Sequence, residues 1–563
     1  SEIESEPNAR DWQTWLAGLA AAGRATRVPI VHNDSRDEAL WVSIERLACV
    51  RAVYPQARCE PPLTPPPDYD EPWTEDAALV ELIRARLSGF GPLTVAQIAR
   101  PLALEASVVA LALTRLEAEG SVMRGRFTPG ARDEEWCERH LLARIHRYTV
   151  RKLRREIEPV ERHDFMRFLF EWQHVARDAR GSGRDALAAM LEQLEGWEAS
   201  ALAWEDEILP ARIDDYTPML LDELCRSGRL TWARLPARVG AATTTVRSTP
   251  VVLLPRREVA RWTALVDATD TDGLSVRAQR VYGALLRHGA MFFDELAADA
   301  HLLGVELENA LGELVAAGLV NADSFAGLRA LVKPAAKRNA HHGRRKPRGF
   351  GPLAGGMADA GRWAVLRRVE PADEQESATD DGSARTPRAV TASPARRPPA
   401  DPALLEHVAD VLLRRYGVVC WQVLAREAAW LPPWRDLLRV LHRMEARGNV
   451  RGGRFVAGLS GEQFALPEAV ALLREVRRRG ERSVRSDRSD RSEGETVCIA
   501  AVDPLNLVGS VLPGEKVPAV AGNRLAFRDG VPVAALVAGR FEFRGEFDEA
   551  TRAALRAALA RGA

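Results

Sequence analysis

The segment LEAEGSVMRGRF, residues 116–127, ends a run of helix-forming residues at a glycine and then alternates between apolar and polar residues. Three other segments align with it without a gap, and a fifth is a weaker copy. They are LCRSGRLTWARL at 224–235, LVAAGLVNADSF at 314–325, MEARGNVRGGRF at 444–455 and the weaker LAGLAAAGRATRV at 16–28. Glycine tolerates the left-handed conformation that ends a helix, and alternation is typical of a half-buried strand. The repeat therefore predicts helices that end at a glycine and continue into a two-stranded wing.

The residues before each glycine also follow a common pattern. Residues 79–127 contain a helical segment, a Gly/Pro break, a short helix with Thr94 as its N-cap, and a longer helix. Residues 275–325, with Ser275 as the first cap, and residues 404–455 repeat this order. Helix, short helix, longer helix and wing is the winged-helix form of the helix-turn-helix motif. The sequence thus predicts a tandem array of winged-helix modules.

A chain of 563 residues is too long for one core, so we expect three to five domains. The fold class we predict is mainly α with small β elements (α+β), in which winged-helix modules precede a small C-terminal β-barrel. The barrel is expected because apolar residues alternate near the C-terminus and Asp529-Gly530 is a hairpin-turn signal. The predicted segments are a winged-helix-like module (1–60), a winged helix with a following helical segment (73–180), two winged helices (181–270 and 271–335), a basic Gly-rich segment with a disordered linker (336–400), a winged helix (401–480), and the barrel with a terminal helix (481–563).

Composition restricts the class of protein. No apolar run reaches the roughly 20 residues that a membrane helix needs, and no charged-then-apolar leader opens the sequence. The six cysteines are scattered without a C-x-x-C pair, which argues against zinc ribbons and disulfide frameworks and favours a reducing cytoplasm. Because the first residue is Ser1, we expect a fragment or a processed form.

The formal net charge is zero, yet the charges are unevenly distributed, and local charge sets the affinity for phosphate. Two basic segments are therefore candidate DNA contacts. In the Gly-rich segment they are Lys337, Arg338, Arg344, Arg345, Lys346 and Arg348; in the third helix and wing of the last winged helix they are Arg435, Arg439, Arg443, Arg447, Arg451 and Arg454. A solvated helix face is the alternative interpretation. The third helices that end at Gly120 and Gly318 are acidic, and we expect them to make scaffold or oligomer contacts.

The sequence shows no motif of a nucleotide-hydrolysing or proteolytic site. It lacks G-x-x-x-x-G-K-[ST], H-E-x-x-H and G-x-S-x-G, and His341-His342 has no carboxylate or cysteine beside it, so no metal is expected. Asp503, in AVDPLNLVG, is a carboxylate among apolar residues, an environment that can produce a general base. The alternative is that its carboxylate caps the turn at Pro504.

Several strings make the chain similar to the C-terminal region of the bacterial large helicase-related (Lhr) proteins, and the resemblance covers nearly the whole chain. They are EWCERHLLARIHRYT (135–149), LRREIEPV (153–160), DFMRFLFEWQHV (164–175), ELVAAGLVNADSFAGLRAL (313–331), RGGRFVAGLSGEQFALPEAV (451–470) and DPLNLVG (503–509). The resemblance implies a parent protein with an N-terminal helicase core that uses ATP and Mg, translocates 3′ to 5′ on single-stranded DNA and unwinds DNA or RNA:DNA duplexes. We expect that core to be absent here, and no cofactor in this chain. The resemblance also implies a location in the bacterial cytosol at the nucleoid, DNA as partner, no membrane, and self-association into a homo-oligomer, possibly a tetramer.

Part of the chain is also similar in architecture to the AlkZ-type DNA glycosylases, which unhook interstrand crosslinks. Their Gln-x-Gln or Gln-x-Asp motif has no match, since Gln173-His-Val and Gln422-Val-Leu depart from it. The Lhr resemblance implies uracil glycosylase activity with an acidic catalyst, for which Asp503 is the first candidate and Asp548 the second. We predict the oligomerisation and DNA-binding region of a DNA-repair superfamily 2 helicase. The alternatives are a DNA glycosylase acting on uracil or crosslinked DNA, and a pure homo-oligomer assembly domain.

Overall fold

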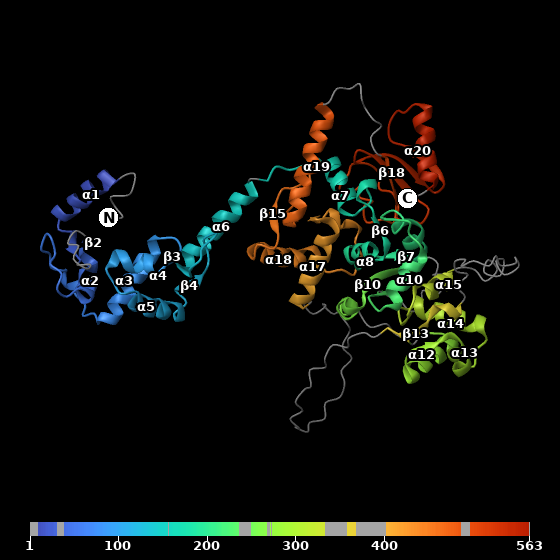
Figure 1. Cartoon of the computed structure of the whole chain (residues 1–563), viewed down its shortest axis with the longest axis horizontal. Helices are drawn as coiled ribbons and strands as arrows, with labels where there is room; N and C mark the ends of the chain where they lie inside the picture. The colour runs from blue at the N-terminus through green and yellow to red at the C-terminus, as the bar shows by residue number, and fades with distance from the viewer. Residues whose placement is uncertain are drawn as a thin grey trace, which may run out of the picture. The chain divides into compact units, whose positions relative to one another are not determined.

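The computed structural model describes residues 9–30, 39–155, 157–235, 249–266, 271, 273–332, 357–366, 401–485 and 496–561. Contacts divide the chain into two compact units, Ser1–Glu156 and Ile157–Ala563, which Figure 1 colours from blue to cyan and from cyan to red. Helices predominate in both units, and the strands form small sheets of two to four members. This arrangement confirms the α+β class.

The first unit contains two small modules. The N-terminal module consists of α1 (Ala9–Ala21), the antiparallel pair β1 (Ala25–Pro29) and β2 (Ala39–Ser43), and α2 (Leu47–Val53). The second consists of α3 (Glu75–Gly89), β3 (Leu93–Thr94), α4 (Val95–Ala99), α5 (Ala106–Ala118), β4 (Val122–Gly125) and β5 (Glu135–Glu138), with sheet order β3–β5–β4. Thr94 caps α4 in a capping box with Gln97, as the sequence predicts for the cap. Helix, short helix, longer helix and sheet make this second module a winged helix.

The described residues of the second unit contain three further modules with the winged-helix order. The first has α8 (Gly183–Gln193), η5 (Trp204–Ile208), α10 (Pro218–Arg226), and the strands β7 (Ala199–Ser200), β9 (Leu230–Ala233) and β10 (Pro250–Pro255). The second has α12 (Val276–His288), α13 (Phe293–Ala300), α14 (Gly304–Ala316), and the strands β11 (Met291–Phe292), β12 (Val320–Ala322) and β13 (Arg362–Val365). The third has α17 (Pro402–Tyr416), η9 (Val423–Arg426), α18 (Trp434–Ala446), and the strands β14 (Val418–Val419), β15 (Arg451–Gly453) and β16 (Gln463–Ala465).

The helix ends confirm the glycine repeat. Helices α1, α5, α10, α14 and α18 each end two residues before their glycine, and the φ angles of these glycines lie between 66° and 82°. At Gly120 the glycine N–H donates to the carbonyl of Glu117 (2.9 Å), and the next N–H, of Ser121, donates to that of Leu116 (2.9 Å). This is the Schellman motif, in which a residue with positive φ satisfies the last carbonyls of the helix.

One predicted wing differs from the structure. In the segment LVNADSF only β12 is a strand, and helix α15 (Phe325–Val332) begins directly after it. The strand that pairs with β12 is β13, far along the chain. Helix α15 forms here because Asp222 of α10 accepts a hydrogen bond from the Ala326 N–H (2.9 Å) at its N-terminus, and because its apolar residues are buried. A cap from another module leaves no signal in the local sequence.

The C-terminal segment forms an open sheet. It contains β17 (Thr496–Ala500), β18 (Arg524–Arg528), β19 (Val531–Val537) and β20 (Arg540–Phe543), paired antiparallel in this order, followed by α20 (Glu549–Arg561). Asp529-Gly530 forms the turn between β18 and β19, as predicted. Within the described residues β17 and β20 do not pair with each other, so the predicted closed barrel is not confirmed.

One core joins distant parts of the second unit. Helix α7 (Arg162–Trp172) packs against α19 (Pro467–Arg485), and its buried Phe170 contacts Phe527 of β18 edge-to-face, with ring centroids 5.3 Å apart. The predicted segment 73–180 therefore spans the division between the two units, while the other boundaries remain predictions.

Among the described residues no single helix is long and apolar enough to span a membrane. Only the pair Val95–Leu102 and Ala106–Ala118, bent by 118°, meets that limit together.

Candidate nucleic-acid interface

Helix α18 and the strand that follows it form the arginine surface predicted for the last winged helix. Residues Leu437, Val440, Leu441 and Met444 of α18 are buried in the module. The opposite face is exposed, and all six predicted arginines lie on it or on the wing. They are Arg435, Arg439, Arg443, Arg447, Arg451 and Arg454. The structure thus brings the whole second predicted set together on one helix and its wing; below, this set is called the α18 surface.

The α18 surface is only partly neutralised. Arg435 and Arg439 expose 76% of their side chains and lie 3.6 and 3.5 Å from the carboxylate of Asp436. Arg447 pairs with Glu406 of α17 at 2.7 Å. Within the described part of the chain, Arg443, Arg451 and Arg454 form no ion pair that would compete with a phosphate. These guanidinium groups are available to an anionic ligand.

A buried glutamine determines the shape of the wing beside this surface. Gln463, on β16, is 1% exposed. Its side-chain oxygen accepts hydrogen bonds from the N–H groups of Phe455 and Val456 (2.9 Å each), and its amide donates to the Val456 carbonyl (3.0 Å). The loop that follows β15 is thereby held to the sheet at the two residues directly after the exposed Arg454.

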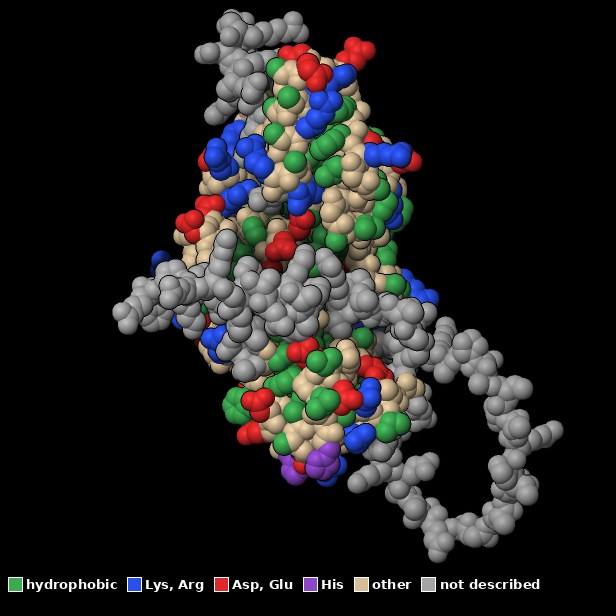
Figure 2. Space-filling model, turned by 90° about the vertical axis from the view of Figure 1, so that its right-hand side faces the viewer, with side chains coloured by type: hydrophobic (Ala, Val, Ile, Leu, Met, Phe, Trp, Pro, Cys, Tyr) green, Lys and Arg blue, Asp and Glu red, His purple; other side chains and the backbone are tan. Residues whose placement is uncertain are grey.

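The first predicted set of DNA contacts, Lys337 to Arg348, lies outside the described residues, as does His341-His342. The face shown in Figure 2 carries Lys and Arg side chains mixed with Asp and Glu. The same mixture of charges extends over the lobe formed by the module of α12, α13 and α14. The third helix of this module, α14, is the acidic helix that we expect to make scaffold or oligomer contacts.

Asp503 lies in a buried ion pair. Arg212, which precedes β8 (Ile213–Asp214), donates from its two terminal nitrogens to the two carboxylate oxygens of Asp503, at 2.6 and 2.9 Å. The side chains of Arg212 and Asp503 are 0% and 1% exposed. The Leu505 N–H also donates to the Asp503 carboxylate (2.9 Å), which is the turn contact expected from the non-catalytic interpretation. A catalytic role for Asp503 stays a prediction, and this geometry supports a structural one.

The ion pair continues into a buried polar network. Gln173, which follows α7 and is 0% exposed, accepts a hydrogen bond from Arg212 (2.9 Å) and donates to the carbonyl of Arg415 (2.8 Å). Arg415 in turn pairs with Glu427. The network therefore connects α7, the module of α8–α10, α17 and the segment after β17. Sequence inspection missed Arg212 entirely, because its partner is 291 residues away and nothing local marks it.

Asp548, the second catalytic candidate, is exposed and precedes α20. Its carboxylate accepts a hydrogen bond from the Thr551 N–H (2.8 Å), the contact of a helix N-cap. Hydrogen bonds from Thr551 lower the pKa of Asp548, so the carboxylate remains ionised. Asp548 thus lies on the surface at the start of a helix, whereas the carboxylate of Asp503 is buried.

A second buried cluster surrounds Glu195. Burial by itself raises the pKa of Glu195, but hydrogen bonds from His407 (3.1 Å) and Trp262 (2.6 Å), together with the charges of His407 and Arg414, bring the pKa below its ordinary value. The carboxylate oxygens of Glu195 and Glu258 and a ring nitrogen of His407 lie within 4.8 Å of one another, a spacing that a metal ion could bridge. Since Trp262 and Arg414 already bind Glu195, the carboxylate is satisfied by protein donors. The cluster fits a structural role.

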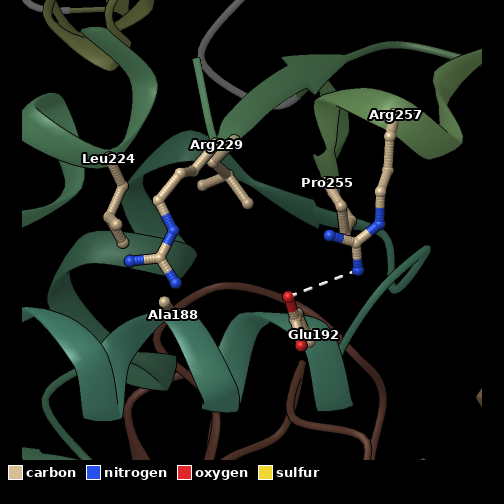
Figure 3. Close-up of a pocket in the computed structure, with 7 residues that line it drawn as sticks. Ala188, Glu192, Leu224, Arg229, Pro255 and Arg257 are labelled. Carbon is tan, nitrogen blue, oxygen red and sulfur yellow. Dashed lines mark ion pairs between the residues drawn. The ribbon is translucent and has the colours of Figure 1, made fainter. Parts of the chain in front are cut away.

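Two of the hollows in the second unit differ in size, and a third, lined by residues of α12 and α13, has about 350 Å³. Figure 3 shows the smaller one, where Arg229 and Arg257 lie across a space of about 100 Å³ and Arg257 pairs with Glu192 at 3.5 Å. This volume is well below the roughly 300–1,000 Å³ of ordinary ligand sites. The larger is a groove of about 310 Å³, below called the α7–α19 groove. It is lined by Arg167, Phe170, Glu171, Ala176, Asp178, Ala179, Arg479, Val497, Phe527, Asp529 and Gly530.

Carboxylates and arginines line the α7–α19 groove. Glu171 is neutralised by Arg479 at 2.6 Å. Asp178 and Asp529 are exposed and form no ion pair with a described residue. Asp529 has a φ of 52°, in the left-handed region that Asp tolerates, and it is among the residues that line the groove. The only sequence signal for this site was the Asp529-Gly530 turn, which predicted a hairpin and no ligand.

Comparison with known proteins identifies two of these modules. Family models described as a winged-helix domain of the large helicase-related protein match residues 160–256 and 398–485. The chain is 30% identical over 566 residues to "Lhr helicase/ probable uracil glycosylase" of Mycolicibacterium smegmatis, an alignment that covers 94% of the chain and 33% of that protein. It is 26% identical over 473 residues to "Lhr helicase/uracil glycosylase" of Escherichia coli, covering 78% and 27%. The chain thus spans about a third of the length of these relatives, and it belongs to the large helicase-related (Lhr) family, as part of the C-terminal region of such a protein.

Proposed function

We propose that this chain is the DNA-binding and self-associating region of a DNA-repair helicase, and that its α18 surface contacts the phosphate backbone. The observation that carries the proposal is that six arginines are exposed on one helix and its wing, opposite a buried apolar face. In helix-turn-helix proteins these two elements approach DNA. The helicase core of the parent protein would use ATP and Mg; the role of this chain would be to hold the DNA on which that core translocates.

Binding of this kind supplies affinity with little sequence readout. Arginines that contact phosphates release condensed counterions, so the affinity falls steeply as salt rises. We expect the chain to bind unrelated sequences about equally well, because phosphate contacts carry no direct sequence information.

The test is DNA binding and particle mass of the full chain, measured over a salt series. Substituting Arg439→Glu and Arg443→Glu on the α18 surface should lower the slope of log affinity against log salt by about 2, since each duplex phosphate contact contributes roughly 0.9. The matched control is Arg184→Glu with Arg226→Glu, two exposed arginines of α8 and α10 in the same unit. Equal binding by the α18 variant and the wild type would refute the proposal.

Particle mass tests the self-association part separately. We expect a homo-oligomer, with a tetramer as one possible state, whose mass the α18 substitutions leave unchanged. If the wild type forms the oligomer but shows no salt-sensitive DNA binding, the chain is an assembly domain only. A monomer at all concentrations would remove the self-association.

A DNA glycosylase is the second candidate function, and the α7–α19 groove favours it. Glycosylases flip a base out of the stack into a pocket. The groove is about 310 Å³ in volume, has Phe170 and Phe527 among its lining residues, and presents the unpaired carboxylates of Asp178 and Asp529. A carboxylate in such a place can activate water or stabilise the cationic sugar. Both relatives above have uracil glycosylase in their names.

The glycosylase test measures base release from uracil-containing and crosslinked DNA without ATP. Asp529→Asn should abolish release while leaving the thermal stability intact, because Asn also tolerates a positive φ. Glu171→Gln, at the same groove but at a carboxylate already neutralised by Arg479, is the control with a smaller expected loss. No release by the wild type on any of these substrates would remove this candidate.

A further inference from the structure

Helix α6 (Arg139–Arg155), at the end of the first unit, carries a one-sided charge. Its sequence RHLLARIHRYTVRKLRR contains seven Arg or Lys residues, two His and no acid. Some other helices balance their arginines: Arg84 of α3 pairs with Glu81 and Glu119, and Arg277 of α12 pairs with Glu306. The composition of α6 is therefore unusual within this molecule, where acidic and basic residues are equal in number.

The charges on α6 form a stripe. Arg144, Arg147, Tyr148 and Arg151 are at positions i, i+3, i+4 and i+7, which lie on one face of a helix and extend over about 10 Å. All four are exposed, and Tyr148 exposes 69% of its surface. Leu142, on the far side of the helix, is half-buried in the unit. The helix thus presents three guanidinium groups and an aromatic ring to solvent on the face opposite Leu142.

No nearby acid neutralises this stripe within the described residues. Arg144, Arg147 and Arg151 form no ion pair there, and the Nε of Arg147 donates to the Ala143 carbonyl of its own helix (3.2 Å). Glu138, the acid that directly precedes α6, directs its two carboxylate oxygens to the N–H groups of His140 and Leu141, at 2.8 and 2.6 Å. It therefore caps the helix N-terminus and leaves the arginines unpaired.

We propose that α6 is a second nucleic-acid-binding element, which takes a single strand along this stripe. Arg144, Arg147 and Arg151 contact successive phosphates, and an unpaired base stacks on Tyr148. Arginines that follow a backbone beside an exposed aromatic ring are the two components of sequence-tolerant single-strand binding. The inference rests on the proposed DNA-binding function and extends it to the first unit, to a different strand state and to residues outside the winged-helix surfaces.

The chemistry of the stripe favours nucleic acid over other polyanions. An interfacial membrane helix needs a wide apolar face free to enter the lipid, whereas on α6 Leu141 and Leu142 are half-buried and the exposed apolar side chain beside them is Ile145, at 36%. An acidic protein surface would satisfy the arginines but would not require an exposed aromatic ring in line with them. DNA and RNA share the phosphates and the base faces that the stripe recognises, so both are used as probes.

The experiment measures binding of the full chain to labelled oligo-dT, oligo-U and a hairpin duplex over a salt series. Substituting Arg144→Gln, Arg147→Gln and Arg151→Gln should lower the single-strand salt slope by about 2, since each contact contributes roughly 0.7. At 0.1 M salt this corresponds to roughly a hundredfold loss of affinity. The control, with equal loss of charge in the same unit, substitutes three other exposed arginines by Gln. They are Arg58, Arg100 and Arg115.

Tyr148 provides an independent test, because its contribution does not depend on charge. Tyr148→Ala should weaken oligo-dT binding by roughly tenfold and duplex binding much less, because only an unpaired base can stack on the ring. Tyr148→Phe retains an aromatic face and should bind like the wild type. Circular dichroism of each variant confirms that the helix content is unchanged. Equal effects of Ala and Phe would overturn the stacking role.

The outcomes separate this inference from the proposed function. If the α18 variant loses duplex binding and the α6 variant binds single strands like the wild type, the inference is wrong and the proposed function stands. If only the α6 variant loses binding, the inference stands and the α18 surface is not the DNA site. A change in particle mass without a change in binding would make the stripe a subunit contact and would overturn the inference.

Discussion

Replacing Asp503 with Asn removes the charge that pairs with Arg212 and keeps the size of the side chain. The guanidinium of Arg212 is fully buried, so water cannot take over the role of the lost carboxylate. Removing one partner of a buried ion pair costs about 3–5 kcal/mol, because the remaining charge is left in a medium of low polarity. The pair connects residues 291 apart, so we expect the whole second unit to lose stability.

The corresponding change in melting temperature follows from the size of the unit. Unfolding entropy is about 2.1 cal/mol/K per residue, so cooperative unfolding of roughly 400 residues carries about 0.85 kcal/mol/K. A loss of 3–5 kcal/mol therefore lowers Tm by about 4–6 °C. Differential scanning calorimetry of Asp503→Asn against the wild type measures this shift. Asp178→Asn, at an exposed carboxylate without a described ion pair, is the control and should change stability by less than about 0.5 kcal/mol.

A double substitution tests the electrostatic origin of the loss. Arg212→Met combined with Asp503→Leu removes both charges, and such replacements of buried pairs are often neutral or stabilising, so the double variant should melt above Asp503→Asn. An unchanged Tm in Asp503→Asn would refute this reasoning. Loss of base release with an unchanged Tm would further assign Asp503 a catalytic role.

Three other measurements test the packing described above. Glu195→Gln should lower the stability of the chain at pH values above the ordinary Glu pKa near 4.5. Because the pKa of Glu195 is lowered in the folded state, the stability that its carboxylate contributes is lost as the pH falls through that lowered pKa. The melting temperatures of the variant and the wild type should therefore converge in acid. Burial raises the pKa of the Cys225 thiol to about 12, so a maleimide should modify the half-buried Cys59 long before Cys225, and equal rates seen by mass spectrometry would contradict this. Gly530→Ala should lower the stability more than Gly522→Ala. Both glycines have a positive φ, but only at Gly530 would the new methyl group lie 2.0 Å from a backbone oxygen of α7. Equal Tm values for the two variants would show that the turn at Gly530 does not pack against α7.

The repeat was predictable because its cause is local. A helix that ends at Gly120 or Gly448 needs a residue with positive φ, and glycine adopts it without steric cost wherever the motif occurs. The arginines of α18 were predictable for a similar reason, since a 3.6-residue period places apolar and charged residues on opposite faces of one helix. Both features depend on residues within a few positions of each other.

The features that the sequence could not reveal depend on distant residues. The cap of α15 comes from Asp222, and the partner of Asp503 is Arg212, in another module. The same isolated carboxylate in an apolar string is compatible with a general base or with a buried ion pair, and only the partner distinguishes them. Three of the four residues of the α6 stripe, Arg144, Arg147 and Tyr148, lie in the string 135–149, which the sequence analysis used for family likeness and not for charge.

The zero net charge of the chain is compatible with phosphate binding because many of its acids bind backbone groups. Glu138 caps α6, Glu135 accepts from the N–H groups of Phe127 and Thr128, and Asp548 caps α20. An acid whose oxygens are occupied by N–H groups alone, such as Glu138, leaves an arginine elsewhere without a carboxylate, and exposed arginines without a described ion pair lie on α6 and α18. Salt dependence should therefore report the number of unpaired arginines at a bound strand. A chain with equal numbers of acids and bases would then show a steep salt slope, which its net charge alone would not predict.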